Sequence, residues 1–377
     1  MPERLAISQF EGRPKAELDT PALCVDLDLM DANLREMGQC ILSRGKQWRP
    51  HVKCHKIPAI AQRQIAAGAI GVTAAKTSEA EVFVNAGITD VLIANIVVGA
   101  PKLERLIALL RHSDPIVVCD HYAQAEMLST TCKAQGISCR VLMEINLGLN
   151  RVGVRPGVDA RELAQAMSRL PHLMFAGIMG YEGHLLTIAD ADEKREKITS
   201  AMQLLTDMAD AIRSDGIDVG IVSAGGTGSY QITADCPGVT ELQAGGGIFG
   251  DPYYIERCGV TGLQPALRLI TTVISRGKLE RAVLDCGRKS LHPDVHPPRV
   301  ASTVSGRPLP DAEVVQISAE HTTLELGPHS QDLTIGDKIE LIPGYSDHTT
   351  PLHPVLYGLR GGVVETAWPI AARGCIY

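Results

Sequence analysis

The sequence has no Cys-x-x-Cys pair, although it contains 10 cysteines. They are scattered through apolar runs, for example at Cys24, Cys54 and Cys119. Closely spaced cysteine pairs are the usual sign of a structural zinc site, so their absence argues against a zinc knuckle. Separate thiols of this kind are typical of a reduced protein. We therefore expect the chain in the cytoplasm, with its cysteines free and buried.

Long apolar runs and a basic surplus are absent as well. No stretch approaches the roughly 20 apolar residues of a membrane-spanning helix, and the polar segment from Met1 to Lys15 lacks the apolar centre of a signal peptide. The formal net charge is -7, without the concentrated basic patch that a nucleic acid or an anionic membrane would require. We therefore expect neither of these partners, and instead a small-molecule ligand.

From Asp28 to Gly262 the sequence alternates short apolar runs with amphipathic segments. The first predicted helix starts at Asp28, with Asp28 or Asp31 as its cap. Eight β-like runs are then expected, one around Lys53 and the others at 68–75, 90–95, 115–120, 139–146, 174–181, 219–224 and 240–245. Repeated strand-helix units favour a (β/α)8 TIM barrel, with a doubly wound open sheet as the alternative. In a barrel, chemistry belongs at the C-terminal ends of the strands.

After Leu263 the pattern becomes β-rich, without helices between the apolar runs. The runs lie at 267–274, 281–285, 313–318, 322–326, 338–343 and 362–367, and turn signals such as Ser305-Gly306 separate them. We expect a C-terminal antiparallel β domain. On this basis residues 28–262 form the barrel, and residues 1–27 together with 263–377 form the β-rich domain.

Two lysines and two histidines interleave in the stretch Arg49-Pro50-His51-Val52-Lys53-Cys54-His55-Lys56. Pro50 favours an extended backbone before it, and strand alternation then places His51, Lys53 and His55 on one face. A lysine on the inner face of a strand needs a reason, and a Schiff base with a carbonyl compound is a well-attested one. The alternative is a solvated basic turn at the surface.

Two glycine-rich turns follow the last two runs of the predicted barrel. The first is Ser223-Ala224-Gly225-Gly226-Thr227-Gly228-Ser229, and the second is Gly245-Gly246-Gly247. Glycines let backbone N–H groups approach an anion closely, and barrels often bind phosphate in the loops after strands seven and eight. The alternative is a pair of tight strand-to-helix connections. A phosphate site opposite an inward lysine provides the two anchors of pyridoxal phosphate.

A set of sequence blocks in fixed order supports this interpretation. The blocks are Thr20-Pro21-Ala22, Arg49 to Lys53, Asn150 to Val154, Gly180 to His184, Gly225 to Ser229, Glu241 to Gly245 and Asp285-Cys286-Gly287. With them the chain resembles the fold-type III pyridoxal phosphate enzymes, which have an alanine racemase-like N-terminal barrel. It is most similar to the D-threonine aldolase and D-serine dehydratase family.

The resemblance implies a role for each matching residue. Lys53, rather than Lys56, would form the Schiff base, Arg151 would bond the phenolic oxygen of the cofactor, and Tyr181 would act in catalysis. The full predicted set of cofactor-binding residues is His51, Lys53, Arg151, Tyr181, Gly226, Thr227, Gln243, Gly245 and Gly246. Thr187 occupies the position where the aldolases have a histidine, so we expect the nearby His184 to serve as the base. A surface arginine and a tyrosine that only packs are the alternatives for Arg151 and Tyr181.

The resemblance also implies a divalent metal on the C-terminal domain, held by a His-x-Asp or His-x-Cys pair that grips the substrate's β-hydroxyl. In the matching stretch, 343–353, Asp347 falls on the acidic position, but Tyr345 stands where the histidine is expected. The metal site is therefore altered or absent. The ligand set we predict for a Mn, Mg or Zn ion is Asp347, His348 and His353. The alternative is that these residues line the substrate pocket.

The reaction that the resemblance implies is cleavage of a D-β-hydroxy-α-amino acid, such as D-threonine, to glycine or another small amino acid and an aldehyde. The nearest rival is dehydration of D-serine or D-3-hydroxyaspartate by an ammonia-lyase reaction. Amino-acid racemisation is the third reaction, expected if no metal binds. The partner in each case is an amino-acid substrate, and the resemblance further implies a homodimer.

Overall fold

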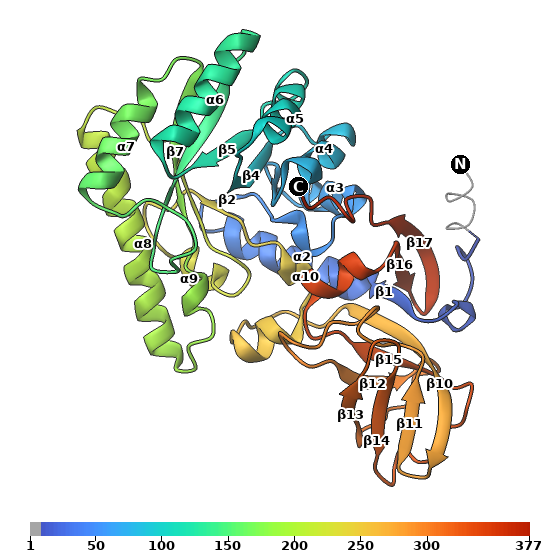
Figure 1. Ribbon diagram of the computed structural model, residues 1–377. Helices are drawn as coiled ribbons and strands as arrows, with labels where there is room; N and C mark the ends of the chain where they lie inside the picture. Colours follow the sequence, from blue (N-terminus) through green and yellow to red (C-terminus); the bar gives the residue numbers. More distant parts are fainter. Residues whose placement is uncertain (1–8) are drawn as a thin grey trace.

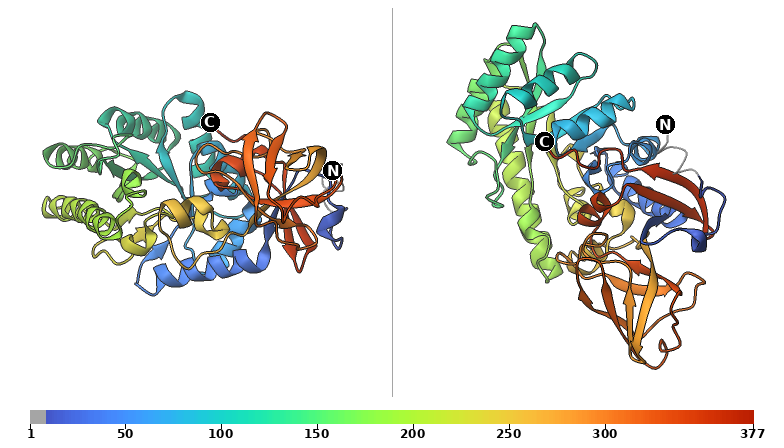
Figure 2. Two further views of the ribbon diagram at one scale, coloured as in Figure 1. Left: turned by 90° about the horizontal axis from the view of Figure 1, so that it is seen from below. Right: turned by 45° about the vertical axis from the view of Figure 1, so that its right-hand side comes forward.

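The computed structural model describes residues 9–377, so the part of the predicted polar N-terminal segment on residues 1–8 lies outside the described residues. A ring of parallel strands wrapped in helices lies beside a mostly antiparallel sheet (Figure 1). Figure 2 shows the same two bodies from two further directions, and the C-terminal strands lie to one side of the ring in both. Within residues 9–377 no helix combines the length and the apolar character needed to cross a membrane.

Eight parallel strands form the ring, in the order β2-β9-β8-β7-β6-β5-β4-β3. Their bounds are β2 Gln47–Trp48, β3 Val72–Ala74, β4 Val91–Ile96, β5 Ile116–Cys119, β6 Cys139–Ile145, β7 Leu173–Gly180, β8 Ile221–Ala224 and β9 Glu241–Leu242. The ring closes where His51 pairs with Thr73 and the N–H of Ile70 donates to the carbonyl of Trp48. The predicted TIM barrel is confirmed, and the open-sheet alternative is wrong because its two edges would stay unpaired.

Helices cover the outside of the barrel, and their bounds are α2 Leu27–Leu42, α3 Pro58–Ala66, α4 Thr77–Asn85, α5 Ala100–Leu110, α6 Tyr122–Gln135, α7 Val158–Ser168 and α8 Ala191–Ser214. Buried side chains recur along α2 at three- and four-residue steps, as the sequence predicts. The cap of α2 is Asp26, whose carboxylate accepts from the N–H groups of Asp28 and Leu29. The prediction of Asp28 or Asp31 as the cap is wrong, because the helix begins directly after strand β1 (Ala22–Asp26).

The second sheet has nine strands, in the order β13-β14-β11-β10-β1-β16-β17, with β15 between β10 and β12. The bounds are β1 Ala22–Asp26, β10 Leu267–Lys278, β11 Arg281–Leu284, β12 Arg299–Thr303, β13 Ala312–Ile317, β14 Thr322–Leu326, β15 Lys338–Ile342, β16 Val355–Arg360 and β17 Val363–Pro369. Sequence reasoning missed β12 and β16. Strand β12 is mostly half-exposed and shows no apolar alternation, and β16 contains Gly358, which packs closely against Leu27.

Hydrogen bonds connect the barrel to segments of the C-terminal part. The side-chain amide of Asn33 on α2 donates to the carbonyl of Gln264 (2.7 Å), which precedes β10, and to the carbonyl of Ile248 (3.1 Å) within the barrel. The N–H of Tyr253 donates to the carbonyl of Gly344 (3.1 Å), just before the short helix α10 (Ser346–Thr349). The predicted division at residues 27/28 and 262/263 stays a prediction. These contacts place α10 at the mouth of the barrel, next to the segment that carries Lys53.

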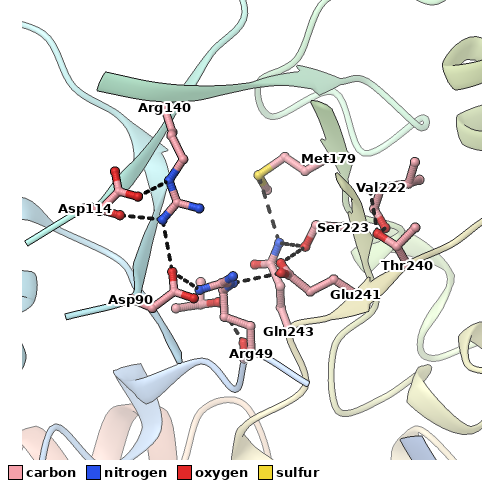
Figure 3. Close-up of polar contacts among 11 residues, drawn as sticks. Arg49, Asp90, Asp114, Arg140, Met179, Val222, Ser223, Thr240, Glu241 and Gln243 are labelled. Atoms are coloured by element: carbon pink, nitrogen blue, oxygen red, sulfur yellow. Dashed lines mark hydrogen bonds and ion pairs between the residues drawn. The ribbon is translucent and has the colours of Figure 1, made fainter. Parts of the chain in front are cut away.

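A network of buried polar side chains joins strands β2 and β9 inside the barrel (Figure 3). Arg49 follows β2, and its Nε lies 2.8 Å from Oε2 of Glu241 on β9. Nη1 of Arg49 lies 2.8 Å from Oδ1 of Asp90. The other oxygen of Glu241 accepts from Oγ of Ser223 (2.8 Å), which in turn accepts from Nε2 of Gln243 (3.0 Å). The network therefore connects a buried positive charge to a predicted cofactor-binding residue.

Replacement of Arg49 should destabilise the fold strongly. In Arg49→Met the buried carboxylate of Glu241 loses its cation, and breaking a buried pair by removing one partner costs about 3–5 kcal/mol. Urea unfolding followed by circular dichroism measures this loss in the free energy of unfolding. The double variant Arg49→Met/Glu241→Gln should recover part of it, because no unpaired charge remains.

The matched control is Arg155→Met, because Arg155 pairs with Asp159 on the surface. Exposed pairs contribute only about 0–1 kcal/mol, so this variant should unfold close to the wild-type midpoint. Equal effects of the two arginine substitutions would contradict a special role for the buried network.

Candidate active site

A cavity of about 320 Å³ opens at the C-terminal ends of the barrel strands. All nine predicted cofactor-binding residues line it, from five different parts of the chain, and they are His51, Lys53, Arg151, Tyr181, Gly226, Thr227, Gln243, Gly245 and Gly246. Other lining residues include Ala75, Asn95, Glu144, Met179 and Tyr254. The structure therefore brings the predicted lysine and both predicted glycine turns into one space.

Lys53 lies in a turn of 3₁₀ helix, Val52–Cys54, rather than in a strand. The turn follows Pro50, and the ring Nδ1 of His51 accepts from the N–H of Lys53 (3.3 Å) at its start. A 3₁₀ helix has three residues per turn, so side chains do not alternate between two faces. His51 and Lys53 nevertheless both reach the cavity.

His55 does not share this face, so the prediction that alternation places it beside His51 and Lys53 is wrong. Its side chain is fully buried and packs edge-on against Phe83, with ring centroids 6.2 Å apart. Burial lowers the pKa of His55 to about 3, so the ring is neutral at physiological pH. Lys56 also lies outside the cavity, because its Nζ is 2.6 Å from Oε1 of the buried Glu79. Among the two lysines of the stretch, Lys53 is thus the one available to a ligand.

The glycine turns fit closely against side chains and backbone around the cavity. A Cβ added at Gly245 would lie 2.1 Å from the carbonyl oxygen of His51, and one added at Gly226 would lie 2.9 Å from the ring of Tyr181. Any larger residue would therefore push these neighbours away. The hydroxyl of Thr227 accepts from the N–H of Gly247 (3.2 Å), which links the two turns.

Glu182 organises the first glycine turn, although sequence reasoning assigned it no role. It is fully buried, and its Oε1 accepts from the hydroxyls of Ser229 (2.5 Å) and Thr233 (3.1 Å). Burial raises the pKa of Glu182 above its usual value. The only signal in the sequence is an acidic residue within the block 180–184. Its partners follow some 50 residues later, so that signal alone could not reveal them.

Arg151, Tyr181 and Glu144 meet on one side of the cavity. The guanidinium carbon of Arg151 lies 5.6 Å from the centre of the Tyr181 ring, within the range of a cation–π contact. Nη2 of Arg151 lies 3.9 Å from Oε1 of Glu144, which is buried. Sequence reasoning missed Glu144, whose signal is a lone acidic residue inside an apolar strand. Glu144 lines the cavity, so its carboxyl group is within reach of a ligand.

His184 is not in the cavity, so the prediction that it serves as the base is not supported by its position. It lies on the short helix Gly183–Leu185, is exposed, and places its ring against Gly148. The helix turns this side chain outward, whereas the strand that precedes it ends with Tyr181 at the cavity. Thr187 is exposed as well.

The three predicted metal ligands are not gathered around one point. Nε2 of His353 is buried and lies 2.7 Å from the carbonyl of Ser290, while His348 is exposed and packs against the ring of His292. Within residues 9–377 no three His, Cys, Asp or Glu side chains are arranged to hold a metal ion. The predicted set of Asp347, His348 and His353 is therefore wrong as a cluster, because the three side chains turn to different neighbours.

Asp347 alone of this set reaches the predicted lysine. Its Oδ2 lies 3.2 Å from Nζ of Lys53, and its side chain is 8% exposed. The same oxygen accepts from the hydroxyl of Tyr345 (3.0 Å). A residue of the C-terminal β-rich part thus completes the surroundings of a barrel lysine. The sequence order predicts nothing about this contact, because Asp347 and Lys53 are far apart in the chain.

Comparison with known proteins agrees with this geometry. Residues 25–252 match the family model of the alanine racemase N-terminal domain, and residues 266–359 match a serine dehydratase domain. A D-threonine aldolase from Arthrobacter sp is 36% identical over 365 residues, which cover 96% of this chain and 95% of the relative.

Solved structures show the same similarity. D-threonine aldolase from Filomicrobium marinum superposes with a TM-score of 0.93 at 37% identity, and the match covers 97% of this chain and 99% of that one. D-threo-3-hydroxyaspartate dehydratase from Delftia sp. HT23 superposes with a TM-score of 0.84 at 26% identity, covering 94% and 98%. The chain therefore belongs to the alanine racemase-like, fold-type III family of pyridoxal phosphate enzymes.

Proposed function

We propose that the chain is a pyridoxal phosphate-dependent aldolase. Its substrate would be a D-configured β-hydroxy-α-amino acid such as D-threonine, and its products glycine, or another small amino acid, and an aldehyde. The observation that carries the proposal is the position of Lys53 in a cavity lined by two glycine turns, with a carboxylate of the C-terminal part, Asp347, 3.2 Å from its amine. The similarity to D-threonine aldolases over almost the whole chain supports it.

The residues around the cavity fit pyridoxal phosphate. Lys53 supplies the amine that would hold the cofactor. The turns at Gly226–Thr227 and Gly245–Gly246 form a cradle whose glycines pack too closely against His51, Tyr181 and Tyr254 to carry a Cβ. When bound there, the cofactor supplies an electron sink for the cleavage of a bond at Cα.

The protein's own residues have distinct tasks in this proposal. Arg151 offers a fixed cation for the phenolic oxygen, and Tyr181 holds that cation through its ring. The ring of His51 is neutral, because burial and the nearby lysine cations lower its pKa well below the usual value. A neutral ring can pack against an aromatic cofactor without competing for its phosphate. Gln243 also lines the cavity, and its side-chain amide donates to the hydroxyl of Ser223.

Aldol cleavage is favoured over dehydration by the degree of similarity. The aldolase structure has the higher TM-score and the higher identity of the two compared above, 0.93 and 37% against 0.84 and 26%. Dehydration and racemisation stay distinguishable outcomes of the same assay. The proposal also includes a homodimer and a location in the cytoplasm, where the 10 free cysteines would stay reduced.

Lys53→Ala should abolish the covalent attachment of the cofactor. The purified wild-type protein should show an absorbance band at the edge of the visible range, and borohydride should bleach it by reducing the bond between lysine and cofactor. Lys53→Ala should lack this band. The control Lys133→Ala removes an exposed lysine on α6 and should keep it. A borohydride-sensitive band that survives in Lys53→Ala would assign the attachment to another lysine.

The reaction itself is decided by the products formed from D-threonine and D-serine. We expect acetaldehyde and glycine in equal amounts from D-threonine, measured by a coupled dehydrogenase assay and by chromatography. Keto acid with ammonia would instead establish a dehydratase, and the L-isomer a racemase. Either result would overturn the proposed aldolase.

Glu144 should make the stability of the protein depend on pH. Burial raises the pKa of Glu144 from 4.5 to about 7, so the folded state holds a proton that the unfolded state releases. The stability that this proton provides is present below pH 4.5 and is lost as the pH rises through about 7, by up to about 3 kcal/mol. Glu144→Gln should remove this loss, as measured by urea unfolding of the cofactor-free protein at about pH 5 and about pH 8.

The control for this measurement is Glu104→Gln, which changes an exposed glutamate on α5. It should keep the wild-type difference between the two pH values. The same pH dependence in Glu144→Gln and wild type would show that Glu144 is not the group responsible.

A further inference from the structure

We propose that this enzyme handles the substrate's β-hydroxyl with Asp347 directly, and that Tyr345 positions this carboxylate in the place of a divalent metal. The inference rests on the proposed aldolase function and specifies how the hydroxyl proton is removed. It starts from a mismatch between the side chains present and a metal site.

Asp347 lies close to the position that the β-hydroxyl of a substrate would take. Its Oδ2 is 3.2 Å from Nζ of Lys53, the nitrogen that marks the position of the substrate's amino group. The β-hydroxyl of a β-hydroxy-α-amino acid is only three bonds from that nitrogen. A carboxylate in this position is within reach of the hydroxyl proton, which is the first requirement for a general base.

Asp347 also has unused capacity to accept a hydrogen bond. Both of its contacts, with Tyr345 and Lys53, are made by Oδ2, whereas the buried Oδ1 has no hydrogen-bond partner. A carboxylate can accept about four hydrogen bonds, and a buried acceptor without a partner is unfavourable because it has given up its bonds to water. A hydroxyl donor from the substrate would remove this cost.

Tyr345 is built as a hydrogen-bond donor rather than as a metal ligand. Its hydroxyl donates to Oδ2 of Asp347, so its proton points at the carboxylate. Its ring is packed edge-on against Tyr253, Tyr254 and His348, with centroids 5.1 to 5.9 Å apart. These contacts hold the hydroxyl 3.0 Å from Asp347. A phenol that donates its proton to a carboxylate is a much weaker ligand for a divalent metal than an imidazole nitrogen.

The backbone between these two residues is fixed from the barrel side. Asp251 is fully buried, and its Oδ2 accepts from both the N–H (2.9 Å) and the hydroxyl (2.6 Å) of Ser346. Ser346 lies between Tyr345 and Asp347, so this double contact sets the start of α10 relative to the cavity. Asp251 of the barrel therefore fixes the position of the Asp347 carboxylate relative to the cavity.

The step balances without any further reactant. As the Cα–Cβ bond breaks, Asp347 takes the proton of the β-hydroxyl and the carbonyl group of the aldehyde forms. The proton then passes to Cα, where the electron pair of the broken bond ends in the new Cα–H bond of the amino-acid product. Asp347 returns to its charged form, and nothing is oxidised or reduced overall.

The test compares metal binding and catalysis in the holoenzyme. After treatment with a chelator and desalting, wild-type protein should contain no stoichiometric metal, should bind no Mn²⁺ in calorimetric titrations, and should cleave D-threonine at its untreated rate with or without Mn²⁺. Asp347→Asn should lose about 100-fold or more in kcat, as expected for removal of a general base. The control Asp332→Asn, at an exposed ion pair with Arg307, should change neither quantity.

Tyr345 is tested as a positioning residue by two substitutions. Tyr345→Phe should lower kcat by about tenfold, the effect of losing one hydrogen bond to a charged group, and should stay insensitive to Mn²⁺. Tyr345→His should gain Mn²⁺ binding and an activity that Mn²⁺ increases, because an imidazole then stands beside the carboxylate. A purely structural role for Tyr345 would give two equally impaired variants without a metal response.

Each result decides the inference. Mn²⁺ binding by the wild-type protein that Asp347→Asn abolishes would overturn it, whatever the activity, because calorimetry does not depend on turnover. Near-wild-type kcat in a folded Asp347→Asn, checked by circular dichroism, would overturn it as well. Wild-type protein that carries the cofactor, binds no Mn²⁺ and cleaves no β-hydroxy amino acid would instead overturn the proposed aldolase function.

Discussion

The ion pair between Arg49 and Glu241 is the interaction on which the candidate site depends. Both side chains are almost completely buried, so without Arg49 the charge of Glu241 would have no cation beside it in the barrel. The pair lies where strands β2 and β9 meet, and Glu241 also holds Ser223, which holds Gln243 under the cavity. Lys53 follows only four residues after Arg49. The geometry of the site therefore rests on the same buried charges that join the first and last strands of the barrel.

Much of this arrangement could be predicted from the sequence, because the signals are local. Apolar runs separated by amphipathic segments predict the barrel, and its closure places the ends of all strands around one opening. The glycine turns after β8 and β9 and the lysine after β2 were therefore expected to meet, and they line one cavity. Even the short helix around Lys53 did not upset this prediction, because Lys53 needs only its position after β2 to reach the opening.

The features that the sequence did not predict depend on contacts between distant segments of the chain. His55 was placed beside Lys53 by strand alternation, but a 3₁₀ turn directs it to Phe83 instead. The role of Glu182 depends on hydrogen bonds from Ser229 and Thr233, which form only in the folded chain. Burial and partners of this kind arise from packing between elements, and periodicity carries no information on them. The predicted metal ligands failed for the same reason, since spacing along the chain did not fix where each side chain turns.

The site is built from two distant parts of the chain, and this division bears on how such an enzyme could change its reaction. The barrel holds the cradle and Lys53, whereas the β-rich part contributes Tyr345 and Asp347 through α10. The hydroxyl of Tyr345 bonds to Asp347, and the cradle residues take no part in that bond. A substitution at position 345 can therefore alter the groups next to the substrate directly, and it reaches the cradle through Tyr254, which packs against both Tyr345 and Gly246. The buried contact of Asp251 with Ser346 makes such a change tolerable, because it anchors α10 independently of the residue at 345.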